Sequence, residues 1–118
     1  MATISGVNYK KIVSAGPESY DLVPFDGAGK PLEFMTIEVD STLGKVDLNL
    51  PEAVNFNGIY TTKINVVALT GLTGNPVNVK CSGTDLIGSA STKSLATDGG
   101  NVVVTPISAT EWSAIVSL

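Results

Sequence analysis

Three carboxylates lie beside predicted turns, and they are the side chains best placed to do chemistry. They are Asp85, Asp98 and Glu111. Two carboxylates can act as acid and base in glycoside hydrolysis, and oxygens from loops can bind calcium. However, carboxylates in turns are usually solvated or bonded to nearby backbone amides, and no Asp-x-Asp-x-Asp spacing marks a calcium loop. We therefore predict no catalytic and no metal-binding residue, and keep a glycan hydrolase using Asp85 or Asp98 as a minor alternative.

The residue types that most enzymes use are missing from the sequence. There is no histidine and no arginine, which removes the commonest general base and the usual clamp for phosphate or carboxylate groups. Cys81 is the only cysteine, so we interpret it as a small apolar residue in a strand. Gly29-Lys30 does not form a phosphate loop, because Pro24 and Pro31 stand where a glycine and a Ser or Thr are needed. We expect no enzymatic activity and no cofactor.

Charge and hydropathy narrow the range of partners. The net charge is −4, all seven basic residues are lysines, and only Lys10 and Lys11 are adjacent. Because binding to a phosphate backbone depends on clustered Lys and Arg, we predict no nucleic acid partner. The longest uncharged window, residues 64–79, contains Gly71 and Pro76, so we also predict no membrane span. Hydrophobic residues make up 43% of the chain and charged residues only 15%, which favours a surface partly covered by other copies of the chain.

The spacing of apolar residues predicts strands rather than helices. Apolar residues alternate with a period near two, and Gly, Pro, Asn and Asp interrupt the chain about every 8–12 residues. This pattern favours an all-β fold with about eight strands. We expect an antiparallel β-sandwich, with a jelly roll as one arrangement of its strands. The predicted strands and short edges cover residues 8–13, 19–23, 32–39, 45–50, 59–69, 77–81, 86–87, 94–95, 102–107 and 111–116. At most one helical turn fits residues 52–57, and no internal repeat is visible.

The whole chain, residues 1–118, is expected to form a single β domain. Its length suits one domain with a real core and is too short for two ordinary ones. Residues 1–45 are expected to add N-terminal strands or an arm that reaches a neighbour, and residues 46–118 to form a β-module.

The same alternation predicts which side chains are buried and which could meet a partner. The predicted core comprises Leu48, Leu50, Ile64, Val66, Val79, Val104 and Trp112. On the long strand, Val67 and Leu69 point away from this core, so we expect either a central strand or one side that a neighbouring subunit covers. Trp112 either closes the core or lies at a subunit contact, with sugar stacking as a weaker alternative. We therefore predict Trp112, Val67 and Leu69 as oligomer or partner contacts.

A particular order of motifs runs through residues 46–118. In chain order it comprises Val46-Asp47-Leu48-Asn49-Leu50-Pro51, Asn57-Gly58, an apolar segment at residues 59–69, Thr84-Asp85-Leu86-Ile87-Gly88, Asp98-Gly99-Gly100-Asn101 and Glu111-Trp112. This order resembles a small β-module of tailed-bacteriophage virion proteins, including fibres and capsid-associated proteins. The segment with Ile87 matches only in part, because Gly88 follows where that family has a polar residue.

The resemblance implies a structural protein with no catalytic residue. Members of this family usually act as homo-oligomers, commonly trimers, so it implies self-association and a place in the virion, assembled in the host cytoplasm. Our leading hypothesis is a capsid-associated protein of the decoration or head-fibre type, which binds the major capsid protein or other virion proteins. The alternative is a tail-fibre or receptor-binding tip component that binds the host surface. After the minor enzyme alternative, the remaining hypothesis is a generic β-sandwich binding module with no phage connection.

Overall fold

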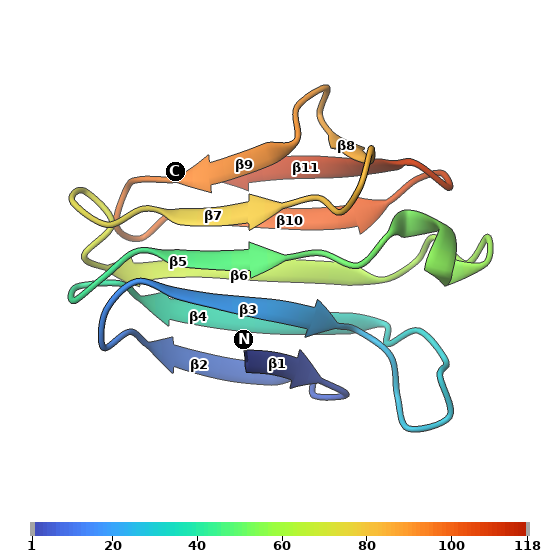
Figure 1. Cartoon of the computed structure of the whole chain (residues 1–118), viewed down its shortest axis with the longest axis horizontal. Helices are drawn as coiled ribbons and strands as arrows, with labels where there is room; N and C mark the ends of the chain where they lie inside the picture. Colours follow the sequence, from blue (N-terminus) through green and yellow to red (C-terminus); the bar gives the residue numbers. More distant parts are fainter. Residues whose placement is uncertain (1, 118) are drawn as a thin grey trace.

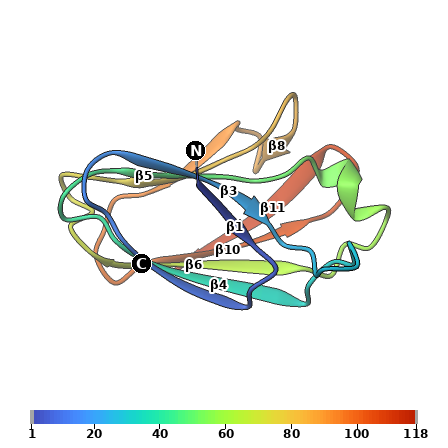
Figure 2. The same cartoon turned by 60° about the horizontal axis from the view of Figure 1, so that its bottom comes forward.

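Two β-sheets face each other across a hydrophobic core. The computed structural model describes residues 2–117, and Figures 1 and 2 show the sheets as two layers. Sheet A has the order β1 (Ala2–Ser5), β3 (Glu18–Val23), β5 (Val46–Asn49), β7 (Val77–Lys80) and β9 (Thr92–Leu95). Sheet B has the order β2 (Tyr9–Val13), β4 (Phe34–Asp40), β6 (Lys63–Thr70), β10 (Asn101–Pro106), β11 (Glu111–Ser117) and β8 (Leu86–Ile87). Within residues 2–117 the only helix is the short 3-10 helix η1 (Ala53–Phe56).

From β1 to β7 the chain winds in coils, with each successive strand joining the opposite sheet. Each strand therefore pairs in parallel with the strand one coil later. Tyr9 lies beside Thr36, 27 positions later, and Phe34 lies beside Lys63, 29 positions later. This arrangement is that of a β-solenoid. Antiparallel pairs of β9 with β7, of β10 with β6 and of β11 with β10, together with a parallel pair of β8 with β11, complete the two sheets.

The all-β prediction is confirmed, but the antiparallel, jelly-roll-like arrangement is wrong. Six of the nine strand pairs are parallel, and the described residues form eleven strands rather than about eight. The reason is that most turns carry the chain across to the other sheet instead of back along the same sheet. In a strand with one buried face, apolar and polar residues alternate in the same way whether its neighbours are parallel or antiparallel. Alternation alone could therefore not distinguish parallel from antiparallel pairing.

Residues 1–45 were expected to form strands or an arm. Their described part contributes β1, β2, β3 and β4, which pair within the two sheets. The strand β1 was not predicted, because its four residues offer only Ile4 as a strongly buried apolar side chain.

The corners of the coils are fixed by buried hydroxyl groups and by a close approach of the backbone. Ser14 follows β2 and Ser41 follows β4 at equivalent corners, and both are buried. The Ser14 hydroxyl donates to the Gly44 carbonyl oxygen at 2.8 Å, and the Ser41 hydroxyl donates to the Asn75 carbonyl oxygen at 2.6 Å. A Cβ atom on Gly44 would lie 2.1 Å from the carbonyl carbon of Gly16, so consecutive corners can stack only with glycine there.

All seven predicted core residues are buried between the sheets, which confirms that part of the prediction. Val46, Leu48, Val77 and Val79 face the core from sheet A, and Ile64, Val66, Val102 and Val104 face it from sheet B. The core depends on strict alternation along each strand, because one residue of slippage would expose the apolar set.

An aromatic cluster lies where η1 meets this core. The Phe56 ring stacks at a tilt on Phe25, with centroids 4.9 Å apart, and meets Trp112 edge-on at 5.5 Å. The predicted helical turn at residues 52–57 is thus observed as η1, and Phe56 is the side chain that anchors it. Figure 1 shows η1 at the right-hand side of the molecule, between the end of β5 and the start of β6.

Candidate functional site

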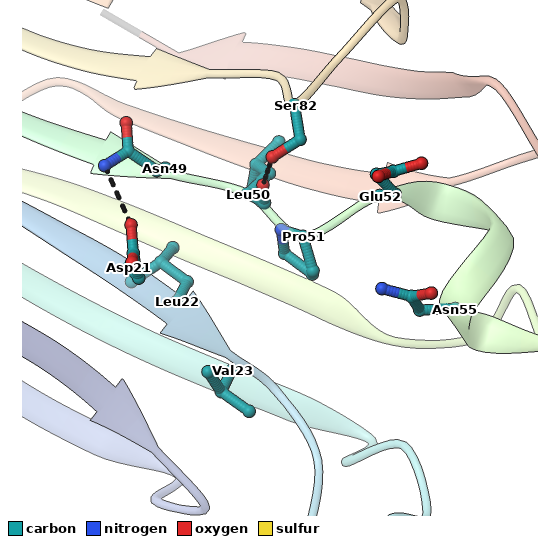
Figure 3. Close-up of a pocket in the computed structure, with 9 residues that line it drawn as sticks. All are labelled: Asp21, Leu22, Val23, Asn49, Leu50, Pro51, Glu52, Asn55 and Ser82. Atoms are coloured by element: carbon teal, nitrogen blue, oxygen red, sulfur yellow. Dashed lines mark hydrogen bonds between the residues drawn. The ribbon is translucent and has the colours of Figure 1, made fainter.

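An open depression of about 330 Å³ lies at the ends of β3 and β5, beside η1. Figure 3 shows its lining residues: Asp21, Leu22, Val23, Asn49, Leu50, Pro51, Glu52, Asn55 and Ser82. Prolines follow both strands, Pro24 after β3 and Pro51 shortly after β5. Since proline has no amide hydrogen, it ends the strand pairing. Asp21 pairs with Asn49, the last residue of β5, so β3 runs two residues beyond the level at which β5 ends. The helix η1 forms the opposite wall.

The polar groups of the depression fall into a bonded set and an unbonded set. Asn49 Nδ2 donates to Asp21 Oδ1 and to Ser19 Oγ, each at 3.0 Å. The side chains of Glu52 and Asn55, by contrast, form no hydrogen bond or ion pair within residues 2–117. In Figure 3, Asp21 and Asn49 lie on one side of Pro51, and Glu52 and Asn55 on the other.

The floor of the depression is apolar, and its rim carries carboxylate and carboxamide groups. Leu22 and Leu50 are buried beneath it, and Val23 and Pro51 are half-buried. No lysine lines it, so the two rim carboxylates, Asp21 and Glu52, have no cationic neighbour within the lining. Such an arrangement can accept hydrogen bonds from a small polar ligand and donate hydrogen bonds to it. Within residues 2–117, no group of three or more His, Cys, Asp or Glu side chains is placed to hold a metal ion.

The three carboxylates considered in the sequence lie outside this depression. Asp85 is 5% exposed, and its Oδ2 accepts a hydrogen bond from the Ala53 amide at 2.8 Å, at the start of η1. Asp98 Oδ1 accepts from the Leu72 amide at 2.9 Å. Glu111 is exposed on β11. Two of the three therefore hold backbone amides, as expected for carboxylates in turns.

Cys81 follows β7 directly and is half-buried against the core. Burial, together with the nearby charge of Asp85, raises the pKa of the Cys81 thiol to about 11. The thiol therefore stays protonated near neutral pH, and a protonated thiol is a poor nucleophile.

The three predicted contact residues occupy different environments. Trp112 is 1% exposed in the core, and its indole Nε1 is buried without a hydrogen-bond partner among the described residues. Val67 and Leu69 lie half-buried on the outer face of sheet B. Of the three, these two therefore present side-chain surface to a partner.

Sequence reasoning missed two further apolar side chains on this face, Val103 and Ile115. Val103 lies diagonal to Val67, since Val103 pairs with Asn65 and Val67 with Asn101. Val103 lies opposite Ile115 in the β10–β11 pair, and Ile115 is 69% exposed. We call Val67, Leu69, Val103 and Ile115 the outer apolar patch. The remaining outward positions on these strands are mostly Asn, Thr and Ser, with Lys63 and Glu111 at the strand starts. The alternation of the last two predicted strands already placed Val103 and Ile115 opposite the core, and this was the signal that could have found them.

The outer face of sheet A is instead a ladder of polar side chains. Asn78 Nδ2 and Lys80 Nζ donate to the Asp47 carboxylate at 2.9 and 3.1 Å, and Ser94 donates to Asn78 at 2.6 Å. Lys45 adds a longer ion pair of 3.8 Å to Asp47. The outer face of sheet B also carries charged side chains, among them Glu38 on β4 and Lys63 on β6, but it differs from sheet A in the apolar patch at its centre.

No protein-family model matches the chain, and no curated protein matches it either. No helix in the described part of the chain is long and apolar enough to cross a membrane.

Proposed function

We propose that the protein is a non-enzymatic structural component of a bacteriophage virion, capsid-associated and of the decoration or head-fibre type. It acts as a homo-oligomer, commonly a trimer in the family that its motifs resemble. The observation that supports this best is the outer apolar patch, because apolar side chains that gather on an exposed strand face are typical of surfaces covered by another protein. The ladder on sheet A then remains in contact with solvent.

Several further features support a structural role. Asp85 and Asp98 are engaged with backbone amides, so they serve the fold. Repeated copies in an assembly convert a weak single contact into firm attachment. The major capsid protein or another virion protein would be the partner.

Co-sedimentation with purified particles tests this proposal. The tagged protein is mixed with phage heads and, separately, with tails, and each mixture is centrifuged through a sucrose cushion. We expect saturable binding to heads, at a fixed number of copies per particle. Binding to neither particle would contradict a virion role.

The second candidate is a tail-fibre or receptor-binding tip component that binds the host surface. The depression beside η1 favours it, because it offers unbonded polar groups that the assembly role does not need. In the same experiment, binding to tails or to host cells but not to heads would favour this candidate.

A further inference from the structure

We propose that the depression beside η1 is a binding site for a neutral saccharide. This goes beyond the virion role and does not depend on it. The concavity is a built feature of the fold, since prolines follow the staggered ends of β3 and β5 and η1 forms the wall on the opposite side. Its volume of about 330 Å³ lies at the lower end of the range, roughly 300–1,000 Å³, that holds small ligands.

The polar groups of the depression suit the hydroxyl groups of a ligand better than they suit an anionic or a cationic group. Each sugar hydroxyl can donate one hydrogen bond and accept others. Asp21 supplies acceptor oxygens beyond the one that Asn49 uses, and the Asn55 carboxamide supplies both an acceptor and donors. Because Asn55 has no partner within residues 2–117, bonding a ligand costs it no existing hydrogen bond.

The apolar part of the depression fits the other character of a sugar ring. Val23 and Pro51 are half-buried between the two polar sides, where Figure 3 places Pro51 centrally. The C–H face of a ring can rest there while its hydroxyls reach Asp21 and Asn55. Burial of apolar surface then adds to the hydrogen bonds.

Charge selects among saccharides and against other ligands. Asp21 and Glu52 would repel an acidic sugar or a phosphate, and no lysine lines the site to offset them. A simple cation would gain little, because both carboxylates are exposed and screened by water and salt. A neutral, hydroxyl-rich ligand avoids the repulsion that an anion meets, and its binding does not depend on the weak attraction that a cation would gain.

Amide chemical shifts of the isolated, isotope-labelled chain test the proposal. The probes are maltose, cellobiose, lactose and N,N′-diacetylchitobiose, with glucuronate and putrescine as anionic and cationic comparisons. We expect saturable shifts at Asn49, Asn55 and Ser82 with at least one neutral disaccharide, and none with glucuronate. Asn55→Ala should weaken that binding by at least about tenfold. Asn55 is exposed on η1, so the substitution leaves the fold in place.

Two further variants separate a saccharide site from a cation site. Asn55→Asp keeps the shape but removes the donors, so it should weaken saccharide binding and would strengthen binding of putrescine at a cation site. Glu111→Gln, an exposed acid outside the depression, should leave saccharide binding unchanged. Saturable shifts with putrescine alone, saccharide binding unaffected by Asn55→Ala, or no saturable shift with any neutral disaccharide would each overturn the proposal.

Discussion

Asp47 lies in a network of side chains on the outer face of sheet A, and this network makes stability depend on pH. Burial tends to raise the pKa of the Asp47 carboxyl. Hydrogen bonds from Asn78 and Lys80, with the charges of Lys80 and Lys45, outweigh it and hold the pKa below its usual value of 3.8. The ionised carboxylate therefore stabilises the fold above the usual Asp pKa, and this contribution disappears as the pH falls through the lower, folded-state pKa.

We predict that the free energy of unfolding falls on acidification from about pH 5 to about pH 2, and that Asp47→Asn removes part of this fall. Urea denaturation at a series of pH values measures it. Glu111→Gln is the control, because the Glu111 side chain makes no hydrogen bond or ion pair within residues 2–117. If Asp47→Asn kept the full wild-type slope, the network would contribute nothing to the acid response.

Cys81 gives a second prediction at this scale. Because its pKa is raised to about 11, the native thiol should react slowly with a thiol reagent. We expect labelling of the folded protein at about pH 8 to be at least tenfold slower than labelling of the urea-unfolded chain at the same pH. Asp85→Asn should speed the native reaction, since the charge of Asp85 contributes to the raised pKa. Equal rates in the folded and unfolded protein would contradict this description of the thiol.

Single residues show where prediction from sequence succeeds and where it stops. All seven predicted core residues are buried, because alternation within one strand fixes which face is apolar. The depression was not predicted, because it depends on Asp21 and Asn49 becoming neighbours across two coils and on Asn55 arriving from η1. Those contacts depend on register between strands, which the spacing within one strand does not reveal.

At the scale of elements, the stacked corners decide whether the coils can pack. Gly44→Ala would place a Cβ atom against the backbone of Gly16 and Pro17, so we predict a loss of about 1–3 kcal/mol in the free energy of unfolding. Gly74→Ala is the matched control, because nothing lies within 4 Å of a Cβ atom there. It should change stability by less than about 1 kcal/mol. Equal effects in thermal or urea unfolding would refute the stacking of the corners.

The coil repeat was present in the sequence in a degenerate form. Tyr20-Asp21-Leu22-Val23-Pro24 and Leu48-Asn49-Leu50-Pro51 occupy equivalent places, since Tyr20 pairs with Leu48 and Asp21 with Asn49. The spacing varies, however, from 18 positions between Ala2 and Tyr20 to 31 between Val46 and Val77. Insertions in the turns therefore hid the repeat, and without it the alternation predicted an antiparallel β-sandwich.

At the scale of the whole molecule, the outer face of sheet B is better suited to assembly than the two edges of that sheet. The edge strand β2 carries Lys10 and Lys11, and the edge strand β8 has only two residues. Lysines and very short strands are the usual means of preventing edge-to-edge pairing. The outer apolar patch has no such protection, so we expect copies to meet there.

The solution mass tests this account most directly. Light scattering after size exclusion, over a range of concentrations, should give a homo-oligomer, with a trimer of the 12.1 kDa chain as the expected state. Ile115→Lys should shift the protein toward monomer, because it places a charge in the patch at a side chain that is 69% exposed and not needed for the core. Ile107→Lys, at a 52% exposed position outside the patch, should leave the oligomer intact. A wild-type protein that stays monomeric at every concentration would contradict assembly through this face.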